Sequence, residues 1–179
     1  VKEESKQLSF LAFCKRYKRF IIFVLGLIFV YFTHVMISNF FIQIITPIGG
    51  TESNMGIAIS LAAIMELPTM IFFNKIREKI SCSTLIRFAV IMFAIKHILI
   101  FIAPNIIVIY IAQTLQMLSY AILIPASVYY ANQVIRKQDA IKGQSMVTVA
   151  ITAGGIISNL IGGVLLDVIS VHHVLLIGV

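Results

Sequence analysis

The sequence predicts an all-α bundle of membrane-spanning helices. Of its 179 residues, 60% are hydrophobic and only 12% are charged, whereas a soluble domain has roughly a quarter of its residues charged. Mean hydropathy is +1.02. Apolar stretches recur along the chain, and each has the length of about 20 residues that crosses a hydrocarbon core as a helix. A polytopic membrane protein is therefore expected.

The apolar stretches predict five complete spans and the start of a sixth. Residues 1–19 form a polar, lysine-bearing segment, expected to be a cytosolic loop that precedes a transmembrane bundle over residues 20–179. The five spans are expected at about residues 20–45, 54–73, 82–103, 106–131 and 144–166. A sixth begins at Val174 and the sequence stops within it at Val179, so we expect a fragment of a longer protein.

Each span ends where the chain becomes polar or meets a helix breaker. Pro47-Ile48-Gly49-Gly50 closes the first span, and the basic link at 74–79 joins the second to the third. Pro104-Asn105 makes the next turn, and the polar link at 132–143 precedes the fifth span. Proline and glycine interrupt helices because proline lacks an N–H and glycine favours turns.

The basic residues predict the orientation of the bundle. Lys and Arg collect in cytoplasmic loops of membrane proteins. Thirteen of the fourteen lie on one side: six within residues 1–19, four between 75 and 87, and three between 136 and 142. The loops around 46–53, 103–105 and 167–173 contain none. The segment is therefore expected to begin in the cytosol, in a plasma (cytoplasmic) membrane.

Several other classes of function are disfavoured. The net charge of +7 would suggest nucleic acid for a soluble protein, but here the charges lie in short loops beside spans, so we expect no nucleic-acid partner. Cys14 and Cys82 lack the number and spacing of a zinc site or a disulfide framework. No paired aspartates, zinc motif or serine nucleophile motif of an intramembrane enzyme is found. We expect no enzyme, no metal and no cofactor.

Two charged residues lie inside spans, Glu66 in the second and Lys96 in the third. Each costs at least about 2.5 kcal/mol to place in lipid, so each should face protein or a water-filled cavity. Glu66 is either a proton-coupling carboxylate or a structural hydrogen-bonded carboxyl. Lys96 either attracts a solute or pairs with Glu66, or else extends to a wet interface. Measured from the cytosolic ends of their spans, the depths of Glu66 and Lys96 in the membrane differ by roughly 9 Å.

Other polar side chains mark helix faces. Tyr110, Gln113, Tyr120 and Ser127 share a face of the fourth span, with Gln116 and Tyr130 at its margins. They either line a solute pathway or join helices. In the first span Tyr31, His34 and Ser38 share a face, and His34 is either a ligand or a packing residue. We predict that His34, Lys96, Gln113, Gln116 and Tyr120 bind the solute. In the fifth span, small residues four apart from Gly154 to Gly163 predict close helix packing.

The order of features resembles the carboxy-terminal half of a major facilitator superfamily permease, in the branch near the lactose and 3-phenylpropionate permeases. The matching features are the basic segment before the first span and His34 within it, Glu66-Leu67-Pro68, the cytosolic run from Asp139 to Gln144, and Gly162-Gly163-Val164-Leu165-Leu166-Asp167. The resemblance implies two six-helix halves around a central site. It places the first, second, fourth and fifth spans beside the cavity and the third and sixth nearer the periphery.

The expected function is secondary active transport of a small solute, a sugar or a small organic acid, by alternating access. Proton coupling through Glu66 is expected, which makes the protein a symporter. Its partners would be the solute, protons, the lipid bilayer and the missing amino-terminal half of the same transporter. The alternative is a membrane receptor or assembly subunit that transports nothing, in which the buried polar groups are purely structural.

Overall fold

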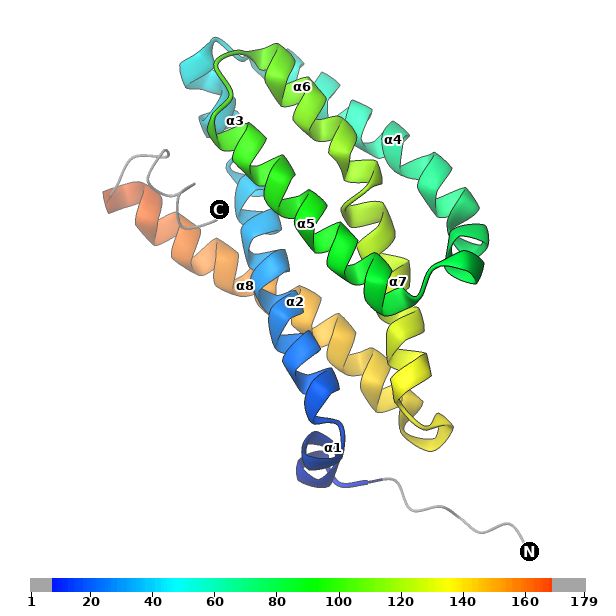
Figure 1. Cartoon of the computed structure of the whole chain (residues 1–179). Coiled ribbons are helices and arrows are strands. Elements are labelled where there is room, and N and C mark those ends of the chain that lie inside the picture. The colour runs from blue at the N-terminus through cyan, green and yellow to red at the C-terminus, as the bar shows by residue number, and fades with distance from the viewer. Residues whose placement is uncertain (1–7, 169–179) are drawn as a thin grey trace, which may run out of the picture.

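The computed structural model describes residues 8–168, which form helices and no strand (Figure 1). In chain order the elements are α1 (Phe10–Arg16), α2 (Lys18–Asn39), α3 (Phe41–Ile45), the 3-10 turn η1 (Thr46–Ile48), α4 (Glu52–Lys79), α5 (Cys82–Phe101), α6 (Ile106–Thr114), the 3-10 turn η2 (Leu115–Met117), α7 (Tyr120–Val134), the 3-10 turn η3 (Lys137–Asp139) and α8 (Ala140–Val168).

Five helical segments are long and apolar enough to cross a membrane, which confirms the predicted transmembrane bundle. They are Lys18–Asn39, Glu52–Lys79, Cys82–Phe101, Ile106–Val134 and Lys137–Val164. The predicted sixth span lies outside the described residues.

The boundaries differ from the sequence prediction in several places, and α8 begins at Ala140, within the expected link of residues 132–143. Helix α4 continues through residues 74–79, which were expected to be a link, because Lys, Arg and Glu are good helix formers once the chain has left lipid. The first span is interrupted at Phe40, between α2 and α3. Residues 1–19, expected as a loop, contain α1 and the first two residues of α2.

Side-chain caps fix the beginning of the helices that follow turns. The Thr51 hydroxyl accepts from the backbone N–H of Asn54 at 3.3 Å, and the Asn54 side chain accepts from the Thr51 N–H at 2.9 Å. The Ser81 and Asn105 side chains likewise accept from backbone N–H groups at the beginning of α5 and α6. These residues supply acceptors to N–H groups that have no partner within the helix. Gly49, with φ of 83°, provides the left-handed residue that ends η1.

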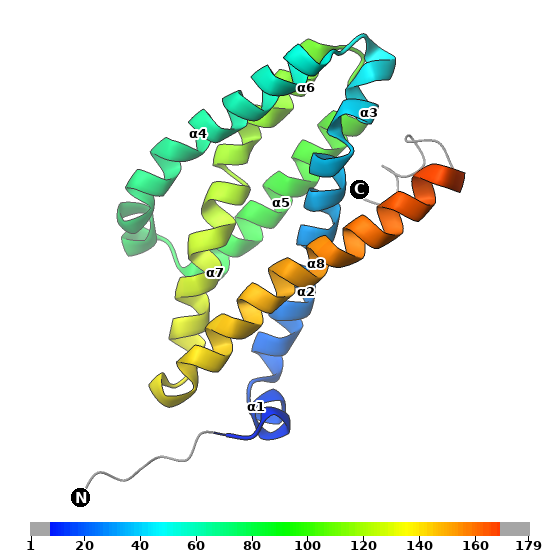
Figure 2. The ribbon, with the colours of Figure 1, turned by 180° about the vertical axis from the view of Figure 1, so that it is seen from behind.

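The helices form two groups. Helices α2 and α8 cross each other, whereas α4, α5 and the α6–α7 segment pack together beside them (Figures 1 and 2). Gly154 permits the close crossing, since a Cβ atom there would lie 2.7 Å from the Ile28 carbonyl oxygen of α2. Nearby, Asn39 donates its side-chain amide to Asn159 at 2.5 Å. The predicted close packing of the small residues of the fifth span therefore involves α2.

One end of the bundle carries α1, the α4–α5 turn and η3, and we call it the basic end because most Lys and Arg residues lie there. At this end the Tyr17 hydroxyl donates to Oδ2 of Asp139 at 3.1 Å and accepts from the Arg136 N–H at 3.4 Å. The Lys142 ammonium donates to the Leu8 carbonyl. These bonds attach the α1–α2 junction to the turn between α7 and α8.

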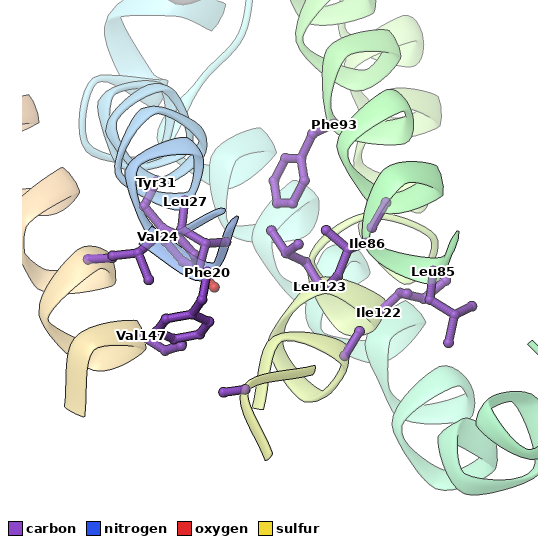
Figure 3. Close-up of a cluster of buried hydrophobic side chains, with 14 of the residues drawn as sticks. Phe20, Val24, Leu27, Tyr31, Leu85, Ile86, Phe93, Ile122, Leu123 and Val147 are labelled. Atoms are coloured by element: carbon purple, nitrogen blue, oxygen red, sulfur yellow. The ribbon is translucent and has the colours of Figure 1, made fainter. Parts of the chain in front are cut away.

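Two apolar clusters fill the interior. The first, nearer the basic end, includes Phe20 and Leu27 of α2, Phe93 of α5 and Leu123 of α7, and Figure 3 shows these side chains converging between the helices. The second lies nearer the opposite end and is built around Ile37, Phe41, Ile100 and Ile109. On α2, α5 and the α6–α7 segment, the predicted polar site residues fall in sequence between members of the two clusters. A polar layer therefore separates two apolar ones.

Candidate functional site

A cavity of about 230 Å³ lies in this polar layer, where α2, α3, α4, α5, α6 and η2 approach one another. Five residues predicted as site residues line it: His34, Glu66, Lys96, Gln113 and Gln116. Ser38 adds a hydroxyl group, and the remaining wall is apolar. The structure thus brings together residues that are separated by up to 82 positions in sequence, as the numbers 34 and 116 show.

Lys96 and Glu66 are joined through the side chain of Gln116. The Lys96 ammonium donates to Oε1 of Gln116, and Nε2 of Gln116 donates to Oε1 of Glu66 at 2.9 Å. The direction of this amide is determined by its neighbours, because an ammonium only donates and an ionised carboxylate only accepts. The neutral amide of Gln116 therefore lies between the two charged groups. We call this chain of three side chains the relay.

Burial makes the relay energetically important. Lys96 is 3% exposed and Gln116 is 6% exposed, while Glu66 is half-buried beside the cavity. A buried ammonium without an acceptor is costly, so Gln116 is needed to satisfy Lys96. The resemblance placed the third predicted span at the periphery of the bundle, yet its Lys96 lines the cavity.

Gln116 reaches its position because the fourth predicted span is not one continuous helix. Helix α6 ends at Thr114, η2 occupies Leu115–Met117, and Ser119 has the non-helical dihedrals φ −102° and ψ −84° before α7 begins. The Ser119 hydroxyl donates to the Leu115 carbonyl at 2.9 Å. Such back-bonding to the residue four earlier tends to bend helices.

This interruption divides the polar face that the sequence predicted for residues 110–127. Tyr110 accepts a hydrogen bond of 2.9 Å from the Asn54 side chain of α4, and Gln113 lines the cavity. Beyond the interruption, Tyr120 packs against rings of α2, and the Ser127 hydroxyl donates to the Leu123 carbonyl of its own helix at 2.6 Å. The interruption therefore divides the expected stripe, and Tyr110 and Tyr120 contact different helices.

His34 stands at the α2 side of the cavity within an aromatic box. Its ring centroid lies 5.0 Å from that of Tyr120, 5.4 Å from that of Phe93 and 6.5 Å from that of Tyr31. Tyr120 is the one predicted site residue that does not line the cavity, and its contact with His34 places it behind that ring. Within residues 8–168, no side-chain hydrogen bond holds the His34 imidazole or the Gln113 amide, and both line the cavity.

Sequence reasoning missed the apolar wall of the cavity. Ala62 and Ala63 lie four and three residues before Glu66 on α4, so helical periodicity could have placed them on its face. Phe41 and Ile59 gave no signal, since apolar residues are common throughout the spans. His97, adjacent to Lys96, faces elsewhere: it packs against Phe93 and lines a separate cavity between α2 and α5.

Comparison with known proteins gives one result. The model of the MFS_1 like family matches residues 2–177, nearly the whole chain. No curated protein and no solved structure matches. The narrower resemblance to the lactose and 3-phenylpropionate permeases stays a prediction.

Proposed function

The chain belongs to the MFS_1 like family, whose members are membrane transporters of the major facilitator superfamily, and we propose that it moves a small solute together with protons. The solute is a sugar or a small organic acid, and Glu66 carries the proton. This chain supplies the carboxy-terminal half, which rocks against an amino-terminal half to alternate access to a central site. Its amino-terminal segment lies in the cytosol, and the membrane is the plasma membrane.

The observation that carries this proposal is the position of Glu66. Its carboxylate lies beside a cavity, is half-buried, and accepts a hydrogen bond from only one of its neighbours in the described chain, Gln116. A carboxylate so placed has a free oxygen that can take up a proton from a wet cavity. Protonation also changes the relay, because a neutral carboxyl no longer balances the charge of Lys96. Proton binding at Glu66 is thereby linked to the contents of the cavity.

The test is solute-driven proton movement by the full-length protein in liposomes, comparing native protein with Glu66→Gln. Glutamine has nearly the same shape and retains an acceptor for the Gln116 amide, so the fold should survive. Glu78→Gln is the matched control, because Glu78 lies exposed on the same helix and outside the cavity. We expect Glu66→Gln to abolish proton movement and Glu78→Gln to leave it intact.

Two outcomes would contradict the proposal. Undiminished proton movement in Glu66→Gln would remove Glu66 from the coupling. If no solute moves with protons in the native protein, and Glu66→Gln only lowers its thermal stability, the relay is structural. That second result would favour the receptor or assembly subunit.

A further inference from the structure

The side chains that line the cavity offer more hydrogen-bond donors than acceptors. An ammonium has three N–H donors, and Lys96 gives one to Gln116. The Gln113 amide is available as well, and the His34 ring lies beside it. Against these groups, Glu66 offers one oxygen that Gln116 does not occupy, and the Gln113 carbonyl and the Ser38 hydroxyl oxygens can also accept. A solute rich in acceptor oxygens fits this surface better than one rich in donors.

The charges of the residues around the cavity also favour a solute with acceptor oxygens. Of the described residues lining the cavity, Lys96 is the one with an ammonium group and Glu66 the one carboxylate. The titratable or charged groups near Glu66 are Lys96 from α5 and His34 from α2, which line the same cavity, and Tyr120 from α7, which packs behind His34. When Glu66 is ionised the relay is neutral overall. When Glu66 takes up a proton, the buried ammonium of Lys96 loses its counter-charge.

An uncompensated ammonium in a buried site is unfavourable, and an anion entering the cavity restores neutrality. Protonation of Glu66 therefore strengthens the binding of an anion at Lys96. By thermodynamic reciprocity, anion binding strengthens protonation by the same factor. A neutral solute would gain nothing from this exchange of charge.

We propose, taking the proton-coupled transport above as premise, that the solute is a small organic monoanion whose carboxylate binds the Lys96 ammonium when Glu66 is protonated. On the premise of two halves, the cavity of about 230 Å³ is the part of the central site that this half contributes. Its apolar wall, including Ile37, Phe41 and Ile59, suits a short aliphatic or aromatic body. The sugar alternative is thereby set aside. One proton and one monoanion cross together, so transport carries no net charge.

The test measures binding to the purified full-length protein by calorimetry in buffers of different ionisation enthalpy, which reports protons taken up per ligand. The probes are lactate and benzoate, each paired with its neutral amide, together with glucose as an uncharged polyol. We expect each bound carboxylate to take up about one proton, and the amides to bind roughly ten- to a hundredfold more weakly.

Substitutions isolate the charge of Lys96. In Glu66→Gln the ammonium is permanently uncompensated, so carboxylates should bind tightly and without proton uptake. Adding Lys96→Gln to that variant makes every member of the relay neutral, avoids a stranded charge, and should remove the preference for carboxylate over amide. Lys137→Gln, at an exposed lysine of η3, is the control and should behave as native protein.

The outcomes separate this inference from its premise. Proton uptake on binding glucose or an amide, with no preference for carboxylates, would overturn the monoanion and leave proton coupling standing. Lys96-dependent carboxylate binding without proton uptake would support the monoanion and overturn the coupling. Unchanged carboxylate preference in the double variant would show that Lys96 does not hold the anion.

Discussion

Gln116 donates its side-chain amide to Glu66 at 2.9 Å, across 50 residues of sequence, from a 3-10 turn that interrupts a membrane span. The same amide accepts from Lys96, so one neutral side chain satisfies both a buried cation and a carboxylate. A short 3-10 stretch within a helix often marks a hinge or local strain. The relay is therefore anchored at the least regular point of the span.

We predict that Gln116→Leu destabilises the protein by about 1–3 kcal/mol, because it leaves the Lys96 ammonium buried without its acceptor. Thermal unfolding in mild detergent measures the effect. Gln133→Leu, at an exposed glutamine of α7, is the matched control and should change stability little. Equal effects of the two substitutions would show that the relay contributes no stability.

A second prediction concerns His34, whose described side-chain contacts are aromatic rather than hydrogen-bonded. His34→Phe keeps a ring within the aromatic box, so the unfolding temperature should stay near the native value. Solute affinity should fall roughly three- to tenfold, the value of one hydrogen bond. A large loss of stability with unchanged affinity would identify His34 as a packing residue.

At the basic end, Tyr17→Phe should destabilise the protein by about 1.5–3 kcal/mol. The Asp139 carboxylate is 1% exposed and its Oδ1 has no partner, so removing the tyrosine hydroxyl leaves Oδ2 unpaired as well. Chemical or thermal unfolding measures the change. Tyr130→Phe is the control, because Tyr130 packs against Phe23 through its ring. Adding Asp139→Asn to Tyr17→Phe should restore part of the loss.

Alanine should destabilise the protein at Gly154 but change its stability little at the adjacent Gly155 of α8. At Gly154 a Cβ atom would meet the α2 backbone at 2.7 Å, and such overpacking costs about 1–3 kcal/mol. At Gly155 the nearest atom is a Val35 methyl group at 3.7 Å, an ordinary contact. Unfolding of Gly154→Ala and Gly155→Ala in detergent compares them. Similar stabilities would mean that α2 and α8 pack less closely than described.

The sequence alone predicts the number of described spans and most of the polar side chains that line the cavity, because both follow from the cost of placing polar groups in lipid. Glu66 and Lys96 stand out for that reason, and both line the cavity. Hydropathy marks where a chain leaves lipid, but it does not report whether the helical hydrogen bonds continue. It therefore misses the extension of α4 through residues 74–79, which are polar but remain helical.

The interruption at η2 has a weaker signal. No proline or glycine occurs from Leu115 to Ser119, so the sequence predicts one regular helix through this segment. A 3-10 turn has 3.0 residues per turn instead of 3.6, which rotates every later side chain about the axis. Tyr120 consequently faces α2, and the bridging role of Gln116 depends on tertiary contacts that no local pattern encodes.

The order of the relay residues along the chain bears on how the protein is made. Glu66 and Lys96 both leave the ribosome before Gln116, the residue that connects them. During that interval the charged hairpin of α4 and α5 has no internal bridge, and charged side chains in lipid are costly. We therefore expect this hairpin to stay in contact with the insertion machinery until α6 and η2 emerge and complete the bridge.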